Sequence, residues 1–139
     1  MGEGIPAKVA NILASEGESK LNGLMADLIR VLAVYKGVSW RSELFVDLSK
    51  MYEFLGRVET VNPRLLDEAL ERLSSEGLIR VEERVRGLML SPGTYRDKLI
   101  HLVDLPDVMR VLVRDRCFRE YMRDRYERVR RRIGLGGRP

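Results

Sequence analysis

The densest group of chemically active side chains in this sequence is a run of arginines near its C-terminal end. The run comprises Arg128, Arg130, Arg131 and Arg132, and Arg123 and Arg125 stand one or two helical turns before it. Planar guanidinium groups match phosphate oxygens, and counterions released from a polyanion favour binding. The alternatives are a basic face for an acidic protein partner and a solvated helix end whose dipole favours cations. The run predicts contacts with nucleic-acid phosphates through Arg128, Arg130, Arg131 and Arg132.

Six further arginines are candidate nucleic-acid contacts outside this run. One begins a predicted helix, two lie on the next predicted helix, and three lie on a predicted hairpin. Glu82 and Glu83 stand among the hairpin arginines. A solvated hairpin surface is therefore the alternative for those three. The six candidates are Arg41, Arg64, Arg72, Arg80, Arg84 and Arg86.

The residues that common catalytic sites require are missing from the sequence. His101 is the only histidine and Cys117 the only cysteine, which makes a zinc site or a Cys/His nucleophile pair improbable. The sequence contains no Gly-Lys-Ser/Thr phosphate loop. Neighbouring acids such as Glu82 and Glu83 are typical of solvated surface. We expect a protein that is not an enzyme, with no cofactor and no bound metal.

Charge is unevenly distributed along the 139 residues. The net charge is +4, but residues 1–109 carry a net −3 and residues 110–139 a net +7, as counted from the sequence. Arginine outnumbers lysine 20 to 5 and glutamine is absent, a composition that leans toward a heat-adapted source. The single cysteine, the lack of a signal-type N-terminus and the lack of a long apolar run predict a cytoplasmic protein without a membrane span.

Hydrophobic spacing predicts four helices in the first half of the chain. Asn62 followed by Pro63 is a strong helix start, since the asparagine caps and the proline fits the first helical position. Gly37, Gly56 and Gly77 stand where helices are expected to end. The four helices are predicted over residues 6–14, 20–36, 39–56 and 62–77.

After Gly77 the spacing between apolar residues changes from about 3.6 residues to about 2 residues, which indicates strands. We expect a small hairpin with strands over 78–83 and 88–91 and a turn at 84–87. A short helix over 94–102 is predicted next. A final helix is expected from about residue 107 to 133.

The segment from Leu66 to Pro92 resembles the third helix and wing of winged helix-turn-helix proteins. The likeness lies in the Leu70-x-x-Leu73-x-x-x-Gly77-Leu-Ile junction, where glycine permits a sharp turn and the apolar pair anchors the first wing strand. With the two helices before it, the resemblance covers roughly residues 20 to 92. It implies a DNA-binding domain in which the third helix enters the major groove.

The outward face of that third helix departs from the pattern that the resemblance implies. Its exposed positions combine three acids with two arginines, and with Glu76 the helix carries a net charge of −2. A negative helix opposes approach to a polyanion. The outward positions are Arg64, Asp67, Glu68, Glu71, Arg72 and Ser75.

The predicted C-terminal helix carries a long apolar stripe, with arginines over much of its remaining surface. Two interpretations are open: the stripe packs on the chain's own core, or it pairs with a second copy in a homodimer. The residues of the stripe that we assign to dimerisation are Val111, Phe118, Met122, Tyr126 and Val129.

These patterns predict a mostly α fold with a small two-stranded antiparallel wing, a winged helix-turn-helix plus a long C-terminal helix. The expected divisions are an N-terminal arm over 1–17, the winged-helix core over 18–93, C-terminal helices over 94–133 and a tail over 134–139. The leading hypothesis is a dimeric regulator of transcription that binds double-stranded DNA. The alternative is a noncatalytic adaptor that binds protein partners within a transcription- or replication-type complex.

Overall fold

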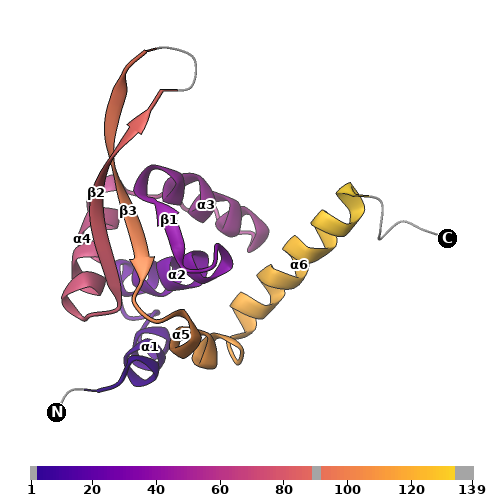
Figure 1. Ribbon diagram of the computed structural model, residues 1–139. Coiled ribbons are helices and arrows are strands. Elements are labelled where there is room, and N and C mark those ends of the chain that lie inside the picture. The colour runs from indigo at the N-terminus through magenta and orange to yellow at the C-terminus, as the bar shows by residue number, and fades with distance from the viewer. Residues whose placement is uncertain (1–2, 89–91, 134–139) are drawn as a thin grey trace.

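The fold is mostly helical, with one small antiparallel sheet (Figure 1). The computed structural model describes residues 3–88 and 92–133. Within these ranges, no helix has the length and apolar character needed to cross a membrane. The helices are α1 (Ile5–Ala14), α2 (Lys20–Val34), α3 (Arg41–Phe54), α4 (Pro63–Ser75), α5 (Leu105–Leu112) and α6 (Arg116–Arg132). The strands are β1 (Val38–Trp40), β2 (Ile79–Gly87) and β3 (Thr94–Leu102).

The four predicted N-terminal helices are confirmed as α1 to α4. Local capping fixes where two of them begin: the Ser19 hydroxyl accepts from the backbone N–H of Asn22, and the Asn62 amide oxygen accepts from those of Arg64 and Leu65. These bonds satisfy N–H groups that a helix start leaves without partners. Gly77 has a φ of 77°, a conformation that side chains disfavour, and it turns the chain from α4 into β2.

The sheet has three strands where the sequence predicted two. Its order is β1-β3-β2 and both pairings are antiparallel. Strand β1 has only three residues, too few for a periodic signal, and it pairs with a strand about 60 positions later, Ser39 opposite Ile100. Figure 1 shows the outer part of β2 and β3 extending beyond the helices.

The hairpin formed by β2 and β3 is longer than predicted, and the predicted helix over 94–102 is wrong. Residues 84–87, expected as a turn, belong to β2, and residues 94–102 form β3. Ile100 and Leu102, on either side of His101, are buried in the core and lie opposite Val81 and Ile79. The expected strand over 88–91 lies outside the described residues except for Leu88, which is in neither strand. The hairpin therefore crosses position 93, where the sequence analysis placed the end of the winged-helix core.

The single C-terminal helix expected from about 107 to 133 is two helices, α5 and α6. The chain breaks between them because Asp115 acts as a helix cap, its carboxylate accepting from the backbone N–H of Phe118. A cap residue has extended rather than helical backbone. Asp115 is also held from the side by Arg30, which fixes the break in place.

The hydrophobic core is built around α2. Leu28, Ile29 and Leu32 of this helix have no exposed surface, and α1, α3, α4, α5 and the sheet all pack against it. The outward positions predicted for α4 leave an apolar stripe that faces the core. Its members, Leu66, Ala69, Leu70 and Leu73, are buried. The expected tail over 134–139 lies outside the described residues.

Candidate nucleic-acid interface

Helix α6 is anchored through its first half. Phe118 and Tyr121 are buried, and the Tyr121 ring lies 5.3 Å from that of Phe54 on α3. The Arg125 guanidinium lies 4.8 Å from the centre of the Tyr35 ring and donates to the Tyr35 hydroxyl at 3.3 Å. These contacts hold α6 against the ends of α2 and α3. Beyond Arg125 its side chains are mostly exposed, and Figure 1 shows the helix leading away from the other elements.

The arginines at the end of α6 are the basic group with the fewest internal partners. Arg128 pairs with Asp124 at 2.9 Å, whereas Arg130 lies over the Tyr126 ring at 5.6 Å and Arg131 donates to a backbone carbonyl. Among the described residues, no carboxylate pairs with Arg130, Arg131 or Arg132. Their guanidinium groups are therefore open to phosphate, a geometry that suits forked hydrogen bonds.

The predicted hairpin arginines are engaged with acids of the same sheet. Arg80 and Arg84 both pair with Glu82, at 3.5 and 2.7 Å. The hydrogen bond from Arg84 is the main reason that the pKa of Glu82 lies below its ordinary value. A phosphate would have to compete with this carboxylate for both side chains, so this part of the hairpin is a weak polyanion surface.

Arg86, near the outer end of β2, is held more firmly than Arg80 and Arg84. It donates to Asp97 at 2.9 Å and lies 4.1 Å from the centre of the Trp40 ring. Asp97 also accepts from the Ser42 hydroxyl at 2.6 Å. Burial alone would raise the pKa of Asp97, but the bonds from Ser42 and Arg86 outweigh it and lower that pKa. Arg86 thus stabilises the hairpin against α3.

The outward face of α4 keeps the acidic character read from the sequence. Arg41 donates through two nitrogens to Asp67, at 2.6 and 3.0 Å, and so is occupied. Arg64 and Arg72 are exposed on α4, but Glu68 and Glu71 are exposed beside them. This helix therefore lacks the positive surface that would bring it to DNA.

The residues assigned to dimerisation are divided by the structure. Phe118 is buried in the chain's own core and Val111 packs partly against it. Met122, Tyr126 and Val129 are 37%, 61% and 50% exposed. The first half of the stripe thus serves the fold, and the second half is open.

No protein-family model, curated protein or solved structure matches this chain. Its surfaces are therefore interpreted from their geometry and charge.

A buried ionic cluster is the feature that the sequence analysis did not identify. Arg30 is 3% exposed and donates to Glu16, Asp27 and Asp115 at 2.8 to 3.0 Å. Burial would lower the pKa of Arg30, but hydrogen bonds to Glu16 and Asp115 hold it above its ordinary value. The only sequence signal is the pair Asp27 and Arg30, three positions apart inside an apolar helix. The cluster joins the α1–α2 loop, α2 and the start of α6.

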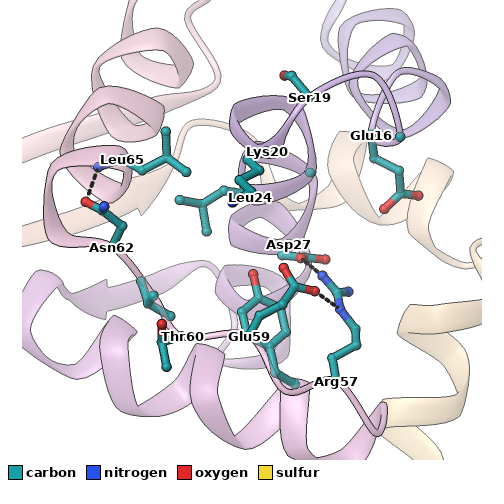
Figure 2. Close-up of a pocket in the computed structure, with 14 residues that line it drawn as sticks. Glu16, Ser19, Lys20, Leu24, Asp27, Arg57, Glu59, Thr60, Asn62 and Leu65 are labelled. Carbon is teal, nitrogen blue, oxygen red and sulfur yellow. Dashed lines mark hydrogen bonds and ion pairs between the residues drawn. The ribbon is translucent and has the colours of Figure 1, made fainter.

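A cavity of about 400 Å³ lies beside this cluster, between the α1–α2 loop, α2 and the α3–α4 loop (Figure 2). Asp27 forms part of its wall, and Arg57 bridges the carboxylates of Asp27 and Glu59 at 3.0 and 2.8 Å. Removal from water raises the pKa of Asp27, although Arg57, Tyr52 and Arg30 oppose the rise. The Asp27 carboxylate already accepts hydrogen bonds from Arg30 and Arg57, so this wall of the cavity stabilises the fold.

The described residues bring together no cluster of three or more His, Cys, Asp and Glu side chains suited to hold a metal ion. His101 pairs with Glu82 at 3.6 Å across the sheet. Cys117 lies partly buried at the start of α6, where burial raises the pKa of its thiol. A raised pKa keeps the thiol protonated and makes it a poor nucleophile.

Proposed function

We propose that this chain is a winged-helix protein that binds nucleic acid, with double-stranded DNA as its partner and transcriptional regulation in the cytoplasm as its role. The support for the fold is the element order from α2 to β3: helix, short strand, helix, helix and hairpin. The long β2–β3 hairpin would be the wing. Gly77 would make the turn from the third helix into it.

The contact with DNA would be made through phosphates by α6, not through base edges by α4. The observation that carries this proposal is the contrast between the two helices: α6 has eight arginines and three acids, while α4 exposes more acids than arginines. Phosphate contacts position a protein without reading sequence. Binding would therefore be strong at low salt and weakly dependent on the base sequence.

A salt titration of binding to random-sequence duplex tests this proposal. If Arg128, Arg130, Arg131 and Arg132 each neutralise one phosphate, the logarithm of the association constant falls against the logarithm of salt with a slope of about −3.6, since each contact contributes about −0.9. Replacing all four with glutamine is expected to flatten the slope to near zero.

In the matched control, Arg80 and Arg84 are replaced with glutamine. These are the two hairpin arginines that pair with Glu82. This variant loses positive charge too, but is expected to change the slope by less than one. A wild-type chain that fails to bind duplex at low salt would refute the proposal. An equal loss of slope in the two variants would place the contact on the hairpin.

The alternative function is a noncatalytic adaptor, and a groove between α4 and the hairpin favours it. The groove has a volume of about 540 Å³ and includes Leu70 and Val81, with Asp67 and Glu71 on the α4 side and Lys98 on β3. An acidic groove with an apolar floor suits a basic protein segment more than DNA. A folded chain that binds no duplex at low salt would favour this function.

A further inference from the structure

The exposed half of α6 carries its apolar residues in the pattern of a helix-pairing seam. Met122, Tyr126, Val129 and Ile133 are separated by four, three and four positions, the spacing of alternate d and a sites in a heptad. They are 37% to 61% exposed, so nothing among the described residues covers them fully. We call these four residues the α6 seam.

The positions that flank the α6 seam are all arginine. In the same heptad numbering, Arg123 and Arg130 are the e sites, and Arg125 and Arg132 are the g sites. The three acids of the helix stand at the remaining sites, away from the seam: Glu120, Asp124 and Glu127. An apolar strip with arginine along both edges is therefore presented to a partner.

The flanking charges select the partner. Side chains at e and g face those of the opposing helix and set which helices pair. Two α6 seams brought together would place arginine against arginine on both edges, which opposes self-pairing. A helix with acids at its e and g sites would place a carboxylate against each arginine.

The apolar side chains of the α6 seam distinguish this surface from one that binds only phosphate. Duplex phosphates can satisfy arginines, but they offer no apolar partner for Met122, Val129 and Ile133. An amphipathic helix satisfies both the strip and its edges. Arg125 is partly committed, since it donates to Tyr35, and Arg130 is half-buried over the Tyr126 ring. The edges are therefore most open at Arg123 and Arg132.

We propose that the α6 seam binds an amphipathic helix of a different protein, one with apolar residues at a and d and glutamate or aspartate at the flanking sites. This contact goes beyond nucleic-acid binding. It uses the apolar strip of the α6 seam, which nucleic-acid binding would leave without a partner.

The probe is a pair of three-heptad peptides, identical except that one has glutamate and the other lysine at every e and g site, with leucine or isoleucine at a and d. Each is titrated against the full chain by fluorescence anisotropy at low salt. The glutamate peptide is expected to bind at least ten-fold more tightly than the lysine peptide. The Arg123→Glu/Arg130→Glu variant is expected to abolish that preference, because one edge of the seam then repels the peptide that the other edge attracts.

The matched control is Arg131→Glu, which makes the same change of charge at an exposed f site opposite the α6 seam. It is expected to alter the affinity for the glutamate peptide less than two-fold. If circular dichroism shows that the double variant has lost helix, Arg130→Glu alone carries the comparison. Val129→Ala is expected to weaken the glutamate peptide several-fold, because it removes part of the strip.

Equal binding of both peptides, or binding of neither, would overturn the proposal. So would a wild-type homodimer that Val129→Asp converts to a monomer, or tighter binding to vesicles rich in phosphatidylserine than to the glutamate peptide. These measurements contain no nucleic acid. A failure of duplex binding therefore leaves their outcome unaffected, and the two proposals fail separately.

Discussion

Individual buried charges carry much of the architecture of this protein. Arg30 is surrounded by carboxylates from three segments, and each of its hydrogen bonds replaces one that water would have made. A buried charge without partners is far more costly than an exposed one. Arg30 therefore requires Glu16, Asp27 and Asp115 to sit where they do, which fixes the loop before α2 and the start of α6 together.

Asp97 gives the hairpin a dependence on pH. Its pKa in the folded chain lies below the ordinary 3.8, so as the pH falls below about 4 the unfolded chain takes up the proton first and stability is lost. Asp97→Asn removes this titration. The difference in free energy of unfolding between wild type and variant is therefore expected to shrink from pH 6 to pH 3, as measured by urea denaturation at each pH.

Ser42→Ala provides the control for Asp97, because it removes one of the donors but leaves the carboxylate with Arg86 and the backbone N–H of Lys98. Its stability is expected to fall between those of the wild type and Asp97→Asn at pH 6. A gap between wild type and Asp97→Asn that widens toward acid would contradict the direction of the pKa shift.

At the scale of elements, helix α4 depends on its buried leucines. Leu73 has no exposed surface, and truncating such a leucine leaves a cavity, so Leu73→Ala is expected to lower the free energy of unfolding by about 2 to 5 kcal/mol. Val58 is 98% exposed, and Val58→Ala is expected to change it by less than about 0.5 kcal/mol. Urea unfolding measures both. A loss below about 1 kcal/mol for Leu73→Ala would mean that α4 packs differently.

The elements that could be predicted from the sequence are those whose signals are local. The start of α4 is set by Asn62 and Pro63, and its end by Gly77, all within the helix or next to it. Strand β1 escaped prediction because its pairing with β3 joins residues about 60 positions apart. Strand β3 pairs locally with β2, but the consecutive apolar residues Leu99 and Ile100 interrupt its alternation. The break before α6 is made locally by the Asp115 cap, but the contact with Arg30 that holds Asp115 joins residues 85 positions apart.

The candidate nucleic-acid contacts likewise include some that could be predicted from the sequence and some that could not. The sequence predicted the arginine run at the end of α6, since eight arginines within one helix are visible as composition. It also placed Glu82 among the hairpin arginines, but it could not show that Arg86 is neutralised, because its partners Glu43 and Asp97 are identified only once α3 and β3 are placed. Arginines that look alike in the sequence therefore differ in whether their guanidinium groups are free to bind a partner.

For the molecule as a whole, the question is how α6 is held to the rest of the chain. Asp115 links them, because its carboxylate accepts from Arg30 at 2.8 and 3.0 Å and also caps α6. Asp115→Ala removes both contacts and leaves Arg30 with Glu16 and Asp27. Hydrogen exchange at the amides of residues 116–125 is therefore expected to quicken at least ten-fold, while the amides of α4 keep their rates.

Asp124→Ala is the matched control, since it removes an acid from α6 whose partner, Arg128, is exposed. It is expected to leave exchange at residues 116–125 within about two-fold of wild type, because exposed ion pairs contribute little to stability. A uniform rise in exchange across α4 and α6 in Asp115→Ala would instead mean that the ionic cluster holds the entire fold together. In that case the two helices would open as one cooperative unit.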